Sequence, residues 1–328
     1  MRRSIPICSA LSGLIALLVI TQHAVAQAYP SRPIGLIVPY PAGGPTDTVA
    51  RIMAEHMHRS LGQPIVVDNL AGASGSIGVG RLSRATPDGY TFGAGTWGTH
   101  VMNGATLALQ YDVVKDFEPI AQFTIEPTLI IAGRTIPAKD LGELIGWLKA
   151  NPDRAVMSTL GPGGGQHFAG MFFQKLTGTS FRFVPYRGLG PAMQDLLAGR
   201  IDLMFGPASN FLPHVRTGAV RAYAVVAENR WAAASDIPTI VEAGLPGFNM
   251  PSWNAFFAPS GTPTNVISKL NAAVVAGLAD PTIRSRLADL GQDVPQLGQQ
   301  SPQALRELQR TEIAKWWPVI KAAALKMQ

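Results

Sequence analysis

Cysteine is nearly absent from this chain: its 328 residues include a single one, Cys8, close to the N-terminus. One cysteine cannot form a disulfide within the chain. If Cys8 is lost with a leader, no thiol nucleophile and no thiolate zinc or iron–sulfur site remains. Charge is also sparse, at 15% of residues, and the one adjacent Lys/Arg pair is Arg2-Arg3. We therefore expect no binding to nucleic acid.

Motifs for catalysis and for metal binding are missing too. Residues 72–76 (Gly-Ala-Ser-Gly-Ser) place the second glycine one position too early for a G-x-S-x-G elbow. His56 and His58 lie two positions apart on a predicted helix and face different ways, and no H-E-x-x-H motif occurs. No glycine-rich loop is followed by the Lys-Ser/Thr of a P-loop. The sequence therefore predicts no catalytic residue, no metal site and no cofactor, and the chain is not expected to be an enzyme.

The N-terminus has the layout of a secretory signal peptide. Arg2 and Arg3 precede an apolar stretch at 5–20, and Ala24-Val25-Ala26 is an A-x-A cleavage pattern. The alternative is an uncleaved membrane anchor, but a bilayer span needs about 20 apolar residues and this stretch is short. We expect residues 1–26 to be removed on export to the periplasm, which lowers the formal charge from +6 to +4.

The remaining chain alternates between segments with strand and helix patterns. Its hydrophobic content of 47% can build substantial cores, and about 300 residues suit two domains. Strands are predicted at 34–40, 65–67, 90–94, 129–132, 155–158, 181–184, 201–205, 221–226 and 254–258. Helices are predicted from a cap at Thr46 or Asp47 to Leu61, and at 141–150, 166–176, 191–198, 209–217, 263–279, 281–290 and 302–324. This alternation predicts an α/β fold with mainly parallel sheets covered on both faces.

The C-terminal part breaks the alternation because it is almost entirely helical. A helical tail fits a chain that leaves a second lobe and returns to brace the first. We expect lobe 1 to combine residues 27–126 with 252–328, and lobe 2 to comprise 127–251. Two crossings between the lobes would then form a hinge.

Four glycine-rich or polar loops each follow a predicted strand, at 41–47, 95–100, 161–167 and 205–210. Ligands of open α/β sheets bind at the carboxyl ends of the strands. Glycines let backbone N–H groups approach a ligand, and a helix N-terminus favours an anion, which leaves carboxylate and phosphate both open. Taken singly, each loop is as compatible with a tight turn, and His167 with a residue that closes its loop.

The order of these motifs resembles a known family, the substrate-binding proteins of tripartite tricarboxylate transporters, also called Bug receptors. The resemblance covers the whole mature chain. Its motifs are Tyr29-Pro-Ser-Arg-Pro-Ile34, the 41–47 loop, Pro87-Asp-Gly-Tyr-Thr91, Asp112-Val-Val-Lys-Asp-Phe117, Val184-Pro-Tyr-Arg-Gly188, Leu196-Leu-Ala-Gly-Arg-Ile-Asp202, Pro238-Thr-Ile-Val-Glu-Ala-Gly244 and Ala258-Pro-Ser-Gly-Thr-Pro263.

The resemblance implies a periplasmic-binding-protein fold of type II, with a small carboxylate buried between two lobes. The ligand class is a dicarboxylate, a tricarboxylate, an acidic amino acid or an aromatic acid. The implied partners are the membrane subunits of a transporter or, alternatively, a membrane sensor, and the receptor is expected to be a monomer. The implied ligand contacts are Ala42, Gly43, Gly44, Asp47, Thr96, Trp97, Thr99, Gly163, Gly164, Gly165, Gln166, His167, Tyr186 and Gly206.

Two positions depart from the family pattern. The family usually carries an aspartate where this chain has Gly206, and hydroxyl residues where it has Gly164 and Gly165. Both changes remove polar side chains from the expected cleft. We expect them to leave room for a bulkier ligand or for water.

Overall fold

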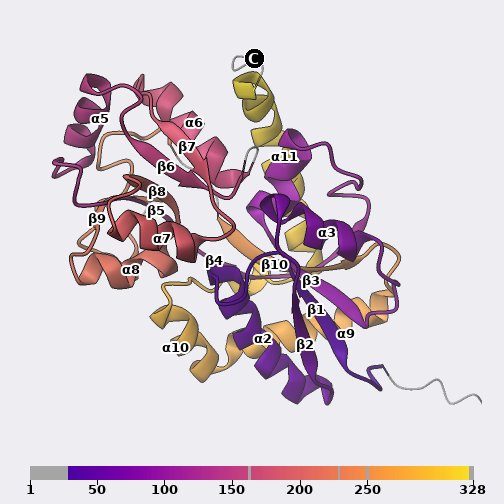
Figure 1. The fold of residues 1–328 in the computed structure, drawn as a ribbon. Helices are drawn as coiled ribbons and strands as arrows, with labels where there is room; N and C mark the ends of the chain where they lie inside the picture. The colour runs from indigo at the N-terminus through magenta and orange to yellow at the C-terminus, as the bar shows by residue number, and fades with distance from the viewer. Residues whose placement is uncertain (1–28, 162–163, 228–229, 249, 251, 325–328) are drawn as a thin grey trace, which may run out of the picture.

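Ten strands form two five-stranded sheets in this computed structural model, which describes residues 29–161, 164–227, 230–248, 250 and 252–324 (Figure 1). The first sheet contains β1 (Ile34–Val38), β2 (Ile65–Asn69), β3 (Thr91–Thr96), β4 (Phe117–Ile125) and β10 (Trp253–Pro259). The second contains β5 (Thr128–Ala132), β6 (Val156–Thr159), β7 (Arg182–Pro185), β8 (Leu203–Pro207) and β9 (Arg221–Val226). We call the parts built on these sheets the first and second lobe.

The two sheets share one plan. Their strand orders are β2-β1-β3-β10-β4 and β7-β6-β8-β5-β9. In each sheet the fourth strand runs antiparallel to its neighbours, and the strands on either side of it run in one direction. These antiparallel strands, β10 and β5, are the ones that begin after the chain has crossed from the other lobe. The predicted α/β class with mainly parallel strands is confirmed.

Helices cover both sheets. They are α2 (Pro45–Leu61), α3 (Ser76–Ser83), α4 (Asn103–Thr106), α5 (Leu141–Ala150), α6 (Gly165–Thr177), α7 (Leu189–Leu197), α8 (Ala208–Arg216), α9 (Thr264–Ala279), α10 (Pro281–Asp289) and α11 (Pro302–Ala324). Helices α2 and α9 pack against each other beside the first sheet, and α11 packs on β4. The helical tail therefore returns to the first sheet, as its sequence pattern predicts.

Helix α11 also touches the second lobe. The ring of Trp316 packs edge-on against Trp97 of the first lobe, with the ring centroids 5.7 Å apart. It packs in the same way against Phe168 and Phe172 of α6, at 6.3 and 6.1 Å. Aromatic pairs in this geometry are stabilising beyond the area they bury. An apolar contact therefore joins the lobes beside the crossings.

Several elements differ from the sequence prediction, and helix α2 and strand β4 show why. Helix α2 is capped by Gly44 and begins at Pro45, not at Thr46 or Asp47, because proline fits the first helical position, where no N–H is needed. Strand β4 was not predicted. Its sequence contains Pro119 and several polar residues, and a proline is tolerated there because β4 is an edge strand with a register shift beside Pro119.

Two further predictions, the signal peptide and the lobe boundaries, stay predictions. The signal peptide at 1–26 lies outside the described residues. The lobe boundaries 27–126 plus 252–328 and 127–251 stay a prediction.

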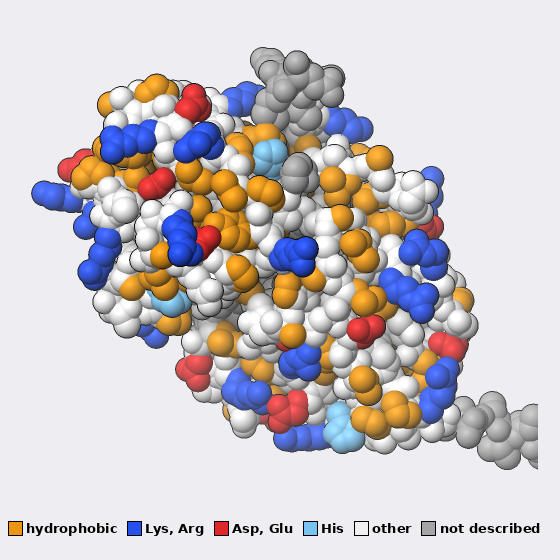
Figure 2. Space-filling view, viewed as in Figure 1, with side chains coloured by type: hydrophobic (Ala, Val, Ile, Leu, Met, Phe, Trp, Pro, Cys, Tyr) orange, Lys and Arg blue, Asp and Glu red, His pale blue; other side chains and the backbone are white. Residues whose placement is uncertain are grey.

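No single helix among the described residues is long and apolar enough to cross a membrane. On the face drawn in Figure 2, Lys and Arg side chains are spread among acidic and neutral ones and form no continuous stripe.

Candidate ligand-binding site

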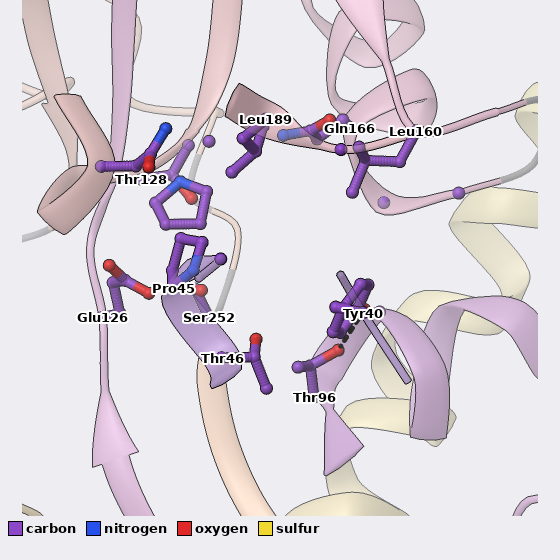
Figure 3. A pocket seen from close by; sticks show the side chains of 18 of the residues that line it. Tyr40, Pro45, Thr46, Thr96, Glu126, Thr128, Leu160, Gln166, Leu189 and Ser252 are labelled. Atoms are coloured by element: carbon purple, nitrogen blue, oxygen red, sulfur yellow. Dashed lines mark hydrogen bonds between the residues drawn. The ribbon is translucent and has the colours of Figure 1, made fainter. Parts of the chain in front are cut away.

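A cavity of about 380 Å³ lies between the two lobes. Its volume is within the range of small-molecule sites. Tyr40 and Thr96 of the first lobe face Leu160 and Gln166 of the second across this space (Figure 3). The side near the crossings is lined by Glu126, Thr128 and Ser252. Loops that follow strands of both sheets therefore converge on one enclosed site.

The loop after β1 enters α2 through a tight turn. The Gly44 N–H donates to the Pro41 carbonyl at 3.2 Å, and the Thr48 N–H donates to the Gly44 carbonyl at 2.9 Å. Gly43 has a φ of +76°, which favours glycine, whereas Gly44 has a φ of −74° that any residue can adopt. Ala42, Gly43 and Gly44 all line the cavity, as the family resemblance implies.

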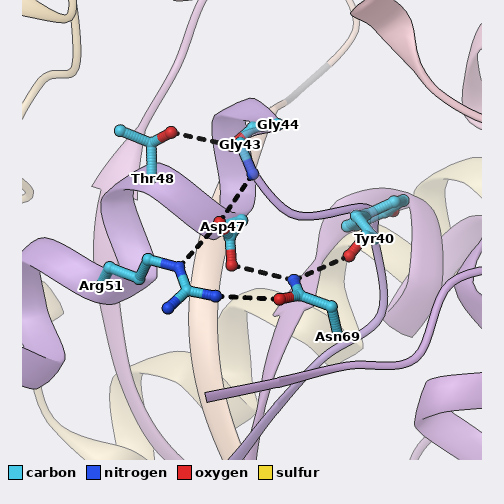
Figure 4. Close-up of polar contacts among 7 residues, drawn as sticks. All are labelled: Tyr40, Gly43, Gly44, Asp47, Thr48, Arg51 and Asn69. Atoms are coloured by element: carbon cyan, nitrogen blue, oxygen red, sulfur yellow. Dashed lines mark hydrogen bonds and ion pairs between the residues drawn. The ribbon is translucent and has the colours of Figure 1, made fainter.

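Asp47 supports this loop from behind and does not line the cavity (Figure 4). Its carboxylate accepts hydrogen bonds from the Gly43 N–H at 2.8 Å, from Arg51 Nε at 2.9 Å and from Asn69 Nδ2 at 2.9 Å. Burial acts to raise the pKa of Asp47, but these three donors outweigh it and leave the pKa below its usual value. Asp47 thus holds the first loop in place, and its contact with a ligand stays a prediction.

The loop after β6 enters α6 in the same way. Gly164 caps the helix, and its N–H donates to the Gly161 carbonyl at 3.3 Å. Gly164, Gly165 and Gln166 line the cavity, and so does Gly206 at the end of β8. A Cβ on Gly206 would lie 2.8 Å from Nε2 of Gln166. The space left by the missing side chain is therefore partly occupied by Gln166, and the expected room for a bulkier ligand or for water stays a prediction.

The second predicted loop is only partly a loop. Thr96 ends β3 and lines the cavity together with Trp97, but a π-helical turn begins at Gly98. This turn directs Thr99 into the protein, where it is fully buried. Thr99 Oγ1 accepts from the Thr96 N–H at 2.9 Å and also contacts His100 Nδ1 at 2.9 Å. Thr99 therefore shapes the end of β3 and does not line the cavity.

Two further predicted contacts lie outside the cavity lining. The ring of His167 packs edge-on against Phe183, 4.6 Å between centroids. The Tyr186 hydroxyl donates to Asp195 at 2.7 Å on α7. Gly163 lies outside the described residues. Nine of the predicted residues line the cavity: Ala42, Gly43, Gly44, Thr96, Trp97, Gly164, Gly165, Gln166 and Gly206.

Two charged residues that line the cavity were not predicted from the sequence. Arg187 stands next to Tyr186 in the Val184–Gly188 motif, and its guanidinium belongs to the second lobe. Glu126 is 3% exposed and lies at the crossing between β4 and β5. Burial raises its pKa to about 7, although hydrogen bonds from Ser209 act in the opposite direction. No local sequence signal marks Glu126, because the segment before it is of mixed polarity.

The described residues contain no group of three His, Cys, Asp or Glu side chains arranged for a metal ion. An enclosed cavity between two α/β lobes, lined by glycine loops at helix starts, defines the class of two-lobed solute-binding receptors. Within that class, the chain belongs to the tripartite tricarboxylate transporter receptor family, whose sequence profile matches residues 49–325.

Solved structures of three relatives agree with this membership. MatC of Rhodopseudomonas palustris, with bound malate, is 39% identical with a TM-score of 0.85, over 89% of this chain and all of MatC. An R. palustris protein with adipate is 33% identical with a TM-score of 0.85, over 90% and 98% of the two chains. The periplasmic binding protein BugD is 36% identical with a TM-score of 0.85, over 90% and 99%. The implied type II periplasmic-binding-protein fold is thereby confirmed.

Proposed function

We propose that this chain captures a small carboxylate between two lobes, 27–126 plus 252–328 and 127–251, and delivers it unchanged to the membrane subunits of a transporter. The observation that carries the proposal is the pair of helix starts, at Pro45 and Gly165, that open onto one cavity. The first N–H groups of a helix lack partners within the helix and favour negative charge.

The lining residues suit a carboxylate in two further ways. Arg187 supplies the cationic side chain in the cavity wall, and a guanidinium can bind a carboxylate through two hydrogen bonds. The malate and adipate bound by two relatives are small dicarboxylates. We propose that the ligand of this chain is a small dicarboxylate and contacts the nine lining residues named above together with Arg187.

A thermal-shift screen of purified mature chain tests this directly. Malate and adipate are compared with their dimethyl esters and with inorganic phosphate, each with and without EDTA. We expect an acid to raise the melting temperature, its ester to have no effect, and EDTA to change nothing. Equal stabilisation by acid and ester, or stabilisation by phosphate alone, would contradict the proposal.

The cellular part of the proposal needs its own measurement. We propose that residues 1–26 are cleaved and that the receptor acts in the periplasm as a monomer. Mass spectrometry of the periplasmic protein should give a mass that lacks these residues. If the chain serves transport, deletion of its gene should abolish uptake of the bound acid. If the chain is a sensor, the same deletion should leave uptake by other routes intact and change only gene expression.

A further inference from the structure

Glu126 occupies an unusual place for a carboxyl group in an anion-binding receptor. It is buried at 3% exposure, lines the cavity, and belongs to the short segment that joins the two sheets. Its N–H donates to the Ser252 carbonyl at 3.1 Å, so it also touches the second crossing. Figure 3 shows its side chain beside Pro45 and Ser252, on the side of the cavity where the lobes are joined.

The two oxygens of Glu126 have different surroundings. Oε1 accepts from both the N–H and the hydroxyl of Ser209, which lies in the first turn of α8. Oε2 accepts no hydrogen bond of standard geometry from the described residues, although the amide of Gln292 lies beside the carboxyl. Because Oε1 accepts both hydrogen bonds from Ser209, the proton of the neutral carboxyl group lies on Oε2.

No cation within the described residues forms an ion pair with Glu126. The groups packed against it are Ser209 of α8, Ser252 before β10 and the neutral amide of Gln292. Asp293 pairs with Ile125 through its backbone. Arg187, the basic residue of the lining, comes from the loop before α7. Ionisation of Glu126 is therefore opposed by burial and is not offset by a neighbouring positive charge.

We propose that Glu126 is a ligand-contacting residue that binds in its protonated form, donating a hydrogen bond from Oε2 to a carboxylate of the ligand, so that each ligand enters the cavity together with one proton. This inference rests on the proposed carboxylate ligand. It assigns one carboxylate of the ligand to the crossing side of the cavity. The site then selects acids with a second carboxylate over monoacids.

The protonation state follows from charge balance. Free Glu126, with its pKa raised to about 7 by burial, is partly protonated at neutral pH. A ligand carboxylate beside it adds a like charge and favours the neutral form further. Carboxyl groups of the ligand ionise well below pH 7, so above pH 7 the ligand itself no longer titrates. Any proton taken up above pH 7 must then be bound by the protein.

Isothermal titration of the mature chain with malate and with adipate, at pH 6 and pH 8.5 in two buffers of different ionisation enthalpy, tests the inference. We expect uptake approaching one proton per ligand at pH 8.5 and little at pH 6. The Kd should rise about 16-fold from pH 7 to pH 8.5, because half of Glu126 is already ionised at pH 7 and each further pH unit above the pKa approaches a tenfold change. Proton release, or a Kd that falls with pH, would mean that Glu126 binds a ligand donor as an anion, and would overturn the proposal.

Two variants test whether Glu126 is the group that takes up the proton when the ligand binds. Glu126→Gln keeps a donor toward the ligand but cannot titrate, so its Kd should change less than about twofold between pH 6 and pH 8.5. Asp293→Asn is the matched control, because burial also raises the pKa of Asp293 but this residue does not line the cavity. The control should keep the proton uptake of the unmodified chain.

The outcomes separate this inference from the proposed function. Acid binding without proton uptake overturns the role of Glu126 and leaves the carboxylate receptor intact. Absence of binding by either acid at both pH values overturns both proposals. Should Glu126→Gln fail to fold, the proton uptake of the unmodified chain still decides the question.

Discussion

The two glycine loops that face each other across the cavity have nearly the same backbone but different supports. Gly44 and Gly164 cap their helices with φ, ψ angles of −74°, 167° and −77°, 165°, and each N–H closes a turn onto the residue three positions earlier. The third helical residue is Asp47 in one case and His167 in the other. Neither lines the cavity.

The difference lies in what that third residue does. Asp47 joins Gly43, Arg51 and Asn69 in one hydrogen-bonded network and fixes the first loop to the sheet. His167 contacts an aromatic ring, Phe183, beside the second loop. The comparison indicates that the first loop is held by hydrogen bonds within its own lobe. Gly164 at the second loop instead lies close to Ser74 of the opposite lobe.

Removing the carboxylate of Asp47 should produce the larger of the expected effects. Asp47→Ala leaves Gly43 N–H, Asn69 and Arg51 without their acceptor, and we expect a loss of about 2–4 kcal/mol in the free energy of unfolding. His167→Ala removes an edge-on ring contact and should cost about 1 kcal/mol or less. Urea unfolding of both variants checks this, and equal losses would break the comparison.

The Asp47 effect also has a defined pH dependence. The pKa of Asp47 is lower in the folded chain than its usual value of 3.8. Its stabilisation is therefore present above that value and lost as the pH falls through the folded pKa. The difference in stability between the unmodified chain and Asp47→Asn should accordingly shrink in acid, and a difference that grows there would contradict the network.

Substituting the two capping glycines tests the same comparison through ligand affinity, with a smaller expected change in free energy than for Asp47→Ala. A Cβ on Gly164 would lie 2.5 Å from Ser74 Oγ of the first lobe, whereas on Gly44 it would meet the carbonyl oxygen of Pro41 at 3.2 Å. We expect Gly164→Ala to weaken acid binding at least tenfold, about 1.4 kcal/mol, by obstructing lobe closure, without loss of apo stability. Gly44→Ala should weaken binding less.

A second substitution tests whether Gly164→Ala weakens binding by obstructing lobe closure or by disturbing a direct contact with the ligand. Ser74 has a φ of +55°, so glycine is tolerated there, and Ser74→Gly removes the clashing oxygen. The pair Gly164→Ala with Ser74→Gly should bind the acid within about threefold of the unmodified chain, because the clash is gone. Failure of this rescue would show that the second loop is not limited by the opposite lobe.

The last expected effect concerns Thr99, whose ligand contact the family resemblance implies, and it is smallest for ligand affinity. Thr99→Val keeps the shape and removes the hydroxyl that joins Thr96 and His100, so unfolding should become easier by about 1–2 kcal/mol. Ligand affinity of the folded variant should change less than threefold. Thermal unfolding and titration measure the two separately, and a loss of affinity alone would return Thr99 to the ligand contacts.

Much of the fold was predictable because its signals are local. Helix α5 and strand β9 have the predicted bounds, since an Asp140 cap and a continuous apolar strand mark them. Strand β4 was missed because Pro119 and alternating polar residues are stabilised by pairing with β10, far away in sequence. In the site, glycines of the loops were predictable from their position after strands. Glu126 was not, since its burial depends on Ser209 of a distant helix.

The central claim is that a carboxylate is held between the two helix starts. A crystal structure of the mature chain with the acid that gives the largest thermal shift tests it most directly. We expect carboxylate oxygens of the ligand within about 3 Å of N–H groups in the first turns of α2 and α6, with no metal ion between them. An acid bound to one lobe alone, or outside the cavity between Gly44 and Gly164, would contradict the account.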